Sequence, residues 1–142
     1  MSRISKALIG MTFTLVIIVT VAFFILRSLV TKSFPVTHGT LQVSGLHSAV
    51  DVHRDTYGIP HISAQDTHDL MLAAGYTHAQ DRLWQMELGR RAGEGRLSEV
   101  LGDTTLKYDL LFRTLGLRGH AQIIYQQLHP ESRQLLTDYT EG

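Results

Sequence analysis

The chain has 142 residues, with 13 basic and 13 acidic side chains, eight histidines and no cysteine. The balanced charge gives no electrostatic reason to expect nucleic acid as a partner, and a chain without cysteine can form no disulfide, no thiolate nucleophile and no thiolate metal ligand. The composition leaves the cellular compartment open.

The first element expected along the chain is a transmembrane helix over about residues 7–26. The segment ALIGMTFTLVIIVTVAFFIL holds 20 residues without a charge, enough for a helix of roughly 30 Å, the thickness of a bilayer's hydrocarbon core. It has no polar face that would suit a buried core helix. A cleaved signal peptide has a shorter apolar run of about 7–15 residues and a small-residue cleavage site. We therefore interpret the segment as an uncleaved signal-anchor, with a cleaved signal peptide as the main alternative.

The charges beside this segment predict its orientation. Arg3 and Lys6 precede it together with the amino terminus, and Arg27 and Lys32 follow it. This small bias favours a cytoplasmic N-terminus. Residues 1–35 then form a cytoplasmic tail, a membrane anchor and a linker, with the lipid bilayer as a partner. Residues 36–142 form an exported domain, periplasmic or extracellular.

Residues 41–63 carry the alternation of apolar and polar residues that is typical of β-strands. The alternation occurs in three short segments, at 41–43, 50–52 and 59–62. Pro60 has no amide hydrogen to donate to a ladder, so it favours a strand start or an edge. We expect two or three antiparallel strands.

From residue 66 the apolar residues recur at helical spacing. Asp66 and Thr67 are good N-cap candidates, with Asp69 in the first turn. Gly75 is expected to divide this region into two helices. The second is predicted over about residues 76–92, stopping at the Gly93–Gly95 pair.

Further helices are expected at 97–101, after Thr104, at 120–128 and at 130–139. Gly102 suits the position just after a helix, and Pro130 suits a first helical position. Strands followed by helices indicate an α+β fold.

The histidines do not predict a metal site. None lies in H-x-H or H-E-x-x-H spacing, and no cysteine is present to complete a tetrahedral site. We expect exposed or hydrogen-bonded histidines and assign no metal ligand.

Four carboxylates could offer a pair for acid–base catalysis. They are Asp81, Glu87, Glu94 and Glu99. Glu87 precedes Arg90 by three residues and Arg91 by four, the spacing of intrahelical ion pairs. Asp81, next to Arg82, could reach another element. A structural network is the favoured interpretation of all four.

Two further patterns also favour a structural role over a role in a functional site. The GEG run at Gly93–Gly95 lacks the full glycine pattern and the Lys-Ser/Thr pair of a phosphate loop, and it follows a helix, so we predict a helix–helix turn. Trp84, Met86 and Leu88 could face a ligand, but such residues in a helical pattern usually belong to the core. We therefore predict that residues 78–102 are scaffold and that Trp84 lies in its core.

Several ordered motifs resemble one known family. They lie within residues 50–102, and the most specific are YGIPHI, then HAQDRLWQME, followed by GRLSEVLG. The resemblance continues through DLLFRTLGLRGHA at 109–121. The region is similar to the start of the mature A-chain of penicillin acylases, and the resemblance runs from about residue 41 to the end.

This resemblance implies an N-terminal nucleophile hydrolase with a four-layer αββα core. In that family a precursor cuts itself, and the new N-terminal serine of the second chain attacks an amide with its own α-amine as the base. Substrates include penicillins and, for some relatives, acyl-homoserine lactones. A bound calcium ion is common, but its ligands lie beyond the region present, so no cofactor is assigned to this chain.

No catalytic or substrate-binding residue carries over to any position of the chain. The nucleophile follows a glycine in the family, and the candidate junction here, Gly39–Thr40, precedes the motifs and is interpreted as a turn. Ser2 would lie on the wrong side of the anchor. The sequence thus predicts a truncated N-terminal part of a membrane-anchored acylase, inactive alone. The alternative is a non-catalytic single-pass membrane protein that reuses this fold piece as a binding or interaction module.

Overall fold

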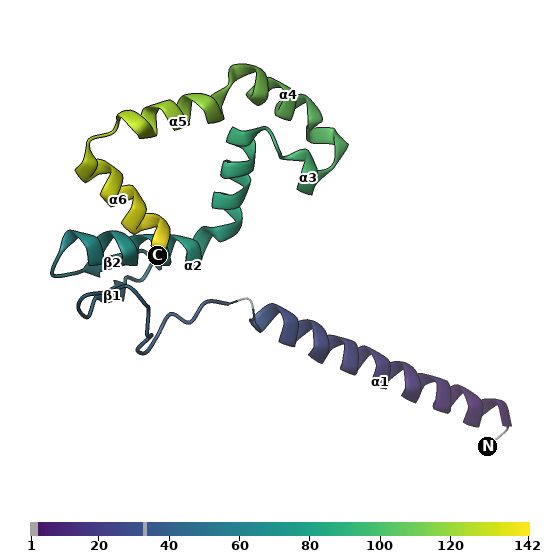
Figure 1. Cartoon of the computed structure of the whole chain (residues 1–142). Coiled ribbons are helices and arrows are strands. Elements are labelled where there is room, and N and C mark those ends of the chain that lie inside the picture. Colours follow the sequence, from purple (N-terminus) through teal and green to yellow (C-terminus); the bar gives the residue numbers. More distant parts are fainter. Residues whose placement is uncertain (1–2, 33) are drawn as a thin grey trace. The chain divides into compact units, whose positions relative to one another are not determined.

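The computed structural model describes residues 3–32 and 34–142, with the side chains of the first range described from Gly10 onward. The chain forms two compact units, Met1–Thr40 and Leu41–Gly142. Figure 1 colours both along the sequence and labels their elements.

Helix α1 (Arg3–Lys32) makes up most of the first unit. Its stretch Gly10–Lys32 is 23 residues long and apolar enough to cross a membrane, a property that N-terminal signal sequences share. The hydroxyls of Thr14 and Thr20 donate to the carbonyls of Gly10 and Val16, at 3.0 and 2.8 Å. These threonine hydroxyls therefore have their partners within the helix, as an apolar environment requires.

The second unit begins with an antiparallel hairpin of β1 (Asp51–Arg54) and β2 (Pro60–Ser63). The Asp55 carboxylate shapes its turn by accepting the amides of Tyr57 and Ile59, each at 2.9 Å. Gly58 has φ of 79°, a left-handed conformation that glycine adopts without strain. The antiparallel pair and the strand start at Pro60 are confirmed. The alternation at 41–43 does not form a strand, because that segment has no partner strand in the sheet.

Helix α2 (Thr67–Glu94) begins where the sequence predicts, with the Asp66 carboxylate accepting the amide of Asp69 at 2.8 Å. The expected break at Gly75 is wrong. The helix continues through Gly75 and bends instead at Arg82, where φ is −140° and ψ is 19°. Gly75 serves close packing, since a Cβ there would collide with the Tyr139 carbonyl.

The remaining elements are all helical, and Gly95, Gly102 and Gly116 end helices with positive φ. The helices are α3 (Ser98–Leu101), the 3₁₀ turn η1 (Asp103–Thr105), α4 (Leu106–Leu115), α5 (Leu117–Gln127) and α6 (Pro130–Glu141). These confirm the four helices expected after residue 96. Helix α5 begins at Leu117 rather than at His120.

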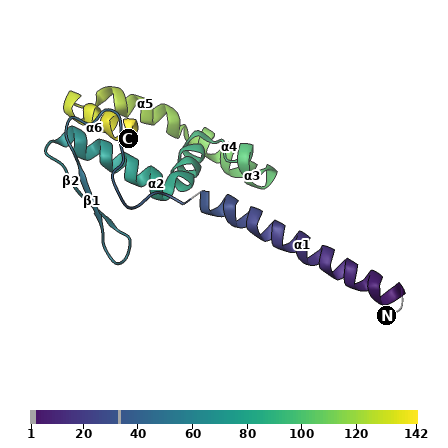
Figure 2. The ribbon, with the colours of Figure 1, turned by 90° about the horizontal axis from the view of Figure 1, so that it is seen from below.

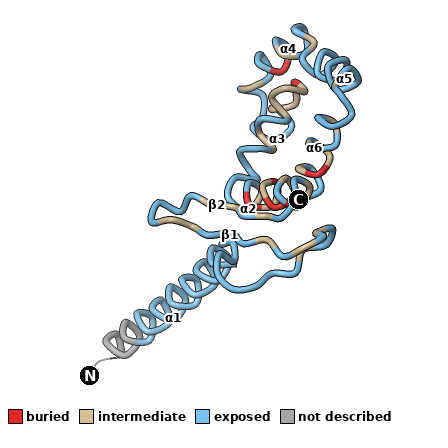
Figure 3. Tube along the Cα trace, turned by 90° about the vertical axis from the view of Figure 1, so that its left-hand side faces the viewer, coloured by how far each residue is buried: buried red, intermediate tan, exposed pale blue. Residues whose placement is uncertain are grey.

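Helix α6 packs beside the first half of α2, and this contact holds the core (Figure 2). Leu72 and Ala73 are its buried apolar residues, and Asp69 and Asp138 are buried with them. Figure 3 shows the buried positions on α2 and α6, with a further one on α4. The fold is mostly helical with one small antiparallel sheet.

Candidate functional site

The hairpin is fixed to α2 by Arg54, the last residue of β1. Its Nη1 and Nη2 donate to both carboxylate oxygens of Asp81, at 2.8 and 3.0 Å, and Nη2 also donates to Gln80 at 2.9 Å. Asp81 directly precedes the bend at Arg82. The sequence interpretation of Asp81 as a structural residue that reaches another element is therefore supported.

Beyond the bend, Glu87 accepts hydrogen bonds from Arg90 and Arg91. The distances are 2.8 Å from Arg90 Nε and 2.6 Å from Arg91 Nε. Hydrogen bonds from Arg90 and then Arg91 lower the pKa of Glu87 to about 2. This carboxylate is ionised at neutral pH, so it cannot donate a proton as a general acid there.

The network continues through Arg96, which contacts both remaining candidate carboxylates. It donates to Glu94 at 2.9 Å and to Glu99 at 2.7 Å. Arg96 lowers the pKa of both carboxyls, with smaller contributions from Arg90 at Glu94 and from Arg91 at Glu99. The cluster thus joins the end of α2 to α3 as a network of ion pairs, as the sequence interpretation expects.

Asp109 on α4 is a buried anchor that sequence reasoning missed. Its carboxylate accepts the amides of Leu97 and Ser98, at 2.6 and 2.8 Å, and the Ser98 hydroxyl. Burial raises its pKa, but the hydrogen bonds from Ser98 and Leu97 outweigh burial, and the net shift is downward. No local pattern relates Asp109 to residues 11 and 12 positions earlier, so only the fold reveals the contact.

A groove of about 850 Å³ lies between the second half of α2 and α5. Gly89, Gly93 and Ala121 are among its lining residues, together with Arg118 and Tyr125. The lining residues include no serine, threonine, lysine or histidine. The groove therefore offers space and charge without a serine or threonine hydroxyl. Gly39 has φ of 95°, in keeping with a turn at Gly39–Thr40, and Ser2 lies outside the described residues.

His47, His68 and Asp69 are the group of described residues whose composition resembles a metal site. The imidazole rings of His47 and His68 stack, with centroids 4.3 Å apart and planes inclined by 19°. A metal lies in the plane of each imidazole that binds it, and two nearly parallel stacked planes do not meet near the rings. Both Asp69 oxygens also accept backbone amides, from His47 and Ser48. In this arrangement the three side chains do not converge on an ion.

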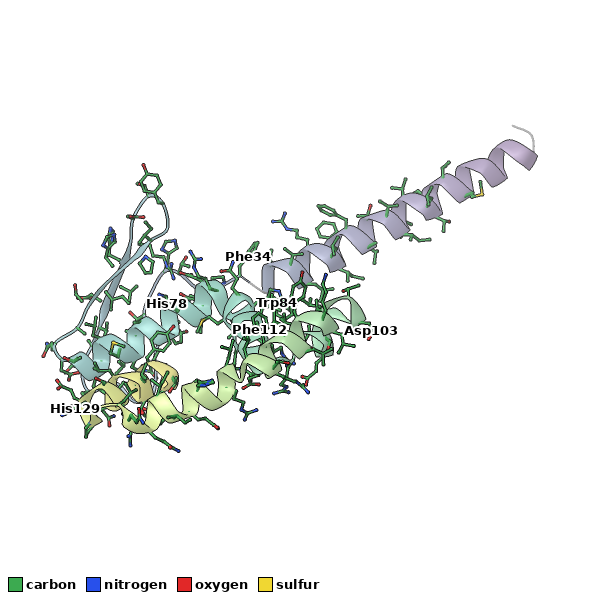
Figure 4. All side chains as sticks on the ribbon, turned by 90° about the horizontal axis from the view of Figure 1, so that it is seen from above. Phe34, His78, Trp84, Asp103, Phe112 and His129 are labelled. Atoms are coloured by element: carbon green, nitrogen blue, oxygen red, sulfur yellow. The ribbon has the colours of Figure 1, made fainter. Side chains whose placement is uncertain are left out.

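Trp84 is exposed, which corrects the prediction that it lies in the core. Its exposed fraction is 55%, and Leu83 and Met86 are also exposed, at 64% and 37%. Trp84 lies beyond the bend of α2 (Figure 4), and the described residues of α4 and α5 leave this apolar stripe uncovered. Sequence periodicity indicates an apolar stripe but does not tell which element covers it.

Comparison with known proteins identifies what the chain is similar to. The family model described as penicillin amidase matches residues 49–142. A penicillin acylase 2 proenzyme from Pseudomonas sp. (strain SE83) is 40% identical over 116 residues, covering 82% of this chain and 15% of that protein. An acyl-homoserine lactone acylase from Pseudomonas aeruginosa is 37% identical over 110 residues, covering 78% and 13%.

A solved structure supports the same relationship. The thermostable penicillin G acylase from Alcaligenes faecalis matches with a TM-score of 0.58 and 35% identity, over 66% of this chain and 50% of that chain. The penicillin G acylase from Escherichia coli is 40% identical over 95 residues, covering 67% of this chain and 11% of that protein. The chain thus spans about an eighth of the length of these curated relatives.

Proposed function

Because the chain belongs to the penicillin amidase family, we propose that it is the N-terminal part of a membrane-anchored acylase that hydrolyses the amide bond of small acyl amides. The observation that carries the proposal is the match over residues 49–142, joined to relatives named as penicillin acylases and acyl-homoserine lactone acylases. In both named substrate classes an acyl group is attached through an amide, so an acyl amide is the substrate class that fits.

In this proposal the second unit is scaffold, and the chemistry belongs to the larger acylase. Each of the four candidate carboxylates, Asp81, Glu87, Glu94 and Glu99, is bound to at least one arginine. The nucleophile would be the N-terminal serine of a second chain, and calcium would bind outside residues 1–142. The exposed apolar stripe of Leu83, Trp84 and Met86 would pack against the rest of that acylase.

The membrane anchor is the second part of the proposal. It is supported by the uncharged length of α1 and the satisfied threonine hydroxyls within it. A periplasmic-type reporter, such as alkaline phosphatase, fused after Gly142 should be active, and the chain should stay in the membrane after alkaline carbonate washing. Activity of a cytoplasmic reporter alone would contradict the orientation. Release of a shortened soluble chain would favour a cleaved signal.

The activity is tested with two proteins: residues 1–142 alone, and the same reading frame continued through its downstream sequence. We expect the longer protein to hydrolyse a chromogenic phenylacetyl amide or an acyl-homoserine lactone, and residues 1–142 to hydrolyse neither. A longer protein with alanine in place of the serine at the processing junction is the control and should be inactive. A stop directly after codon 142 would favour the non-catalytic membrane module instead.

A further inference from the structure

His68 lies where three segments of the second unit meet. It is the second residue of α2, and its ring reaches both the loop before the hairpin and helix α6. Nε2 lies 3.0 Å from the carbonyl oxygen of Gly45, and Nδ1 lies 3.0 Å from Oδ1 of Asp138. A carbonyl and an ionised carboxylate only accept hydrogen bonds. A neutral imidazole has one N–H and can satisfy one of them, whereas an imidazolium has two and satisfies both.

The surroundings of the ring favour this second proton. Asp138 on α6 faces the ring directly, and Asp66, the N-cap of α2, and Asp69 on α2 lie close to it. The loop contributes His47, which stacks on the ring and is itself 63% exposed and paired with Asp66 at 3.2 Å. The Gly45 carbonyl raises the pKa of His68 most, Asp138 raises it next, and partial burial opposes them.

The contact between His68 and Asp138 matters for stability because the Asp138 side chain is only 3% exposed. Its described partners are His68 and the amide of Gln134, which donates to Oδ1 at 2.8 Å. A buried carboxylate that loses its charged partner is strongly unfavourable. Opening of the α2–α6 contact would return that carboxylate to water.

We propose that His68 is a proton-controlled clasp: while its ring is charged it holds helix α6 and the loop at Gly45 against α2, and loss of the proton loosens both. A group whose pKa is raised in the folded state stabilises that state below its ordinary pKa, here about 6.5, and ceases to do so as pH rises through the raised value. The clasp is therefore closed in acid and opens toward alkaline pH. This inference concerns conformation and does not rest on acylase activity.

The test uses the full 142-residue chain in lipid nanodiscs. NMR of ¹⁵N-labelled histidine reports the protonation of both ring nitrogens of His68 between pH 5 and 9, and hydrogen–deuterium exchange reports the opening of α6, after division by the intrinsic rate at each pH. We expect two protonated nitrogens at acid pH and a pKa above the ordinary one. Because protonation and opening are linked, the protection factor of α6 should fall tenfold from acid to alkaline pH for each pH unit by which the measured pKa of His68 exceeds its ordinary value.

Two variants separate the clasp from general destabilisation. His68→Gln should remove the pH-dependent step in α6 protection between pH 5 and 9. His78→Gln is the matched control, because it removes another histidine of the α2–α6 contact. The Nδ1 of His78 lies 2.9 Å from the Tyr139 hydroxyl. This variant should keep the pH-dependent step in α6 protection. A neutral His68 across this range, or α6 protection that stays constant while His68 titrates, would overturn the proposal. If His68→Gln does not fold, the titration of the unmodified chain decides.

Discussion

Both terminal nitrogens of the Arg54 guanidinium group donate hydrogen bonds to the carboxylate of Asp81, which lies 27 residues later in the sequence. Asp81 is one residue before the bend of α2. The Arg54 side chain is only 14% exposed. A hairpin of two short strands is marginally stable alone, so this contact helps to hold β1 and β2 on the helix. The pair therefore links the start of the homologous region to the HAQDRLWQME motif.

Replacing Arg54 should make the hairpin separate more readily from α2. An ammonium cannot reproduce the two parallel hydrogen bonds of a guanidinium, so Arg54→Lys should lower the free energy of hairpin opening by about 1.5–3 kcal/mol. Hydrogen–deuterium exchange over residues 51–63 measures this change. Arg82→Lys is the control, because Arg82 makes an exposed 3.3 Å contact with Gln85. Equal effects of the two variants would show that the hairpin does not depend on the Arg54–Asp81 pair.

Two glycines of α2 should respond oppositely to alanine. A Cβ on Gly75 would meet the Tyr139 backbone of α6, whereas one on Gly89 has open space. Gly75→Ala should therefore destabilise the chain by about 1–3 kcal/mol, despite the better helix propensity of alanine. Gly89→Ala should be neutral or stabilise it by up to about 1 kcal/mol. Denaturation followed by circular dichroism tests the pair, and a stabilised Gly75→Ala would contradict the close approach.

These glycines also show where sequence reasoning reaches its limit. The start of α2 and the end of α3 could be predicted because their causes are local: the Asp66 side chain caps the first turn, and Gly102 takes a positive φ after α3. The break assigned to Gly75 was wrong because its neighbour is Tyr139, 64 residues away, and only tertiary structure reveals that contact. The bend at Arg82 has no local signal, since arginine is a good helix former.

The side-chain contacts divide in the same way. The spacing of Glu87, Arg90 and Arg91 predicts their ion pairs because helix geometry alone brings them together. Asp109 and His68 form their contacts between separate elements, which no spacing encodes. The expectation that this chain holds no catalytic residue stays a prediction, because no contact of the described residues tests it.

The charged end of α2 should weaken in strong acid. The Glu87 carboxyl has a pKa of about 2 against an ordinary 4.5. A lowered pKa means that its contribution to stability is present above about 4.5 and is lost as pH falls through about 2. Exchange protection of residues 88–96 should therefore fall over that window, and Glu87→Gln should reduce the fall. Glu131→Gln, on α6, is the control and should leave it unchanged.

Trp84 gives the most direct test of the proposed packing, because it is the only tryptophan of the chain. At 55% exposure, its fluorescence in residues 1–142 held in nanodiscs should be readily quenched by acrylamide. Clustered exposed apolar side chains mark interaction surfaces, so quenching should fall several-fold in the longer acylase, where the stripe is covered by protein. Lipids brominated on their acyl chains should quench Trp84 in neither protein. Equal acrylamide quenching in both would show that the acylase does not cover this face, and quenching by brominated lipid would assign the stripe to the membrane.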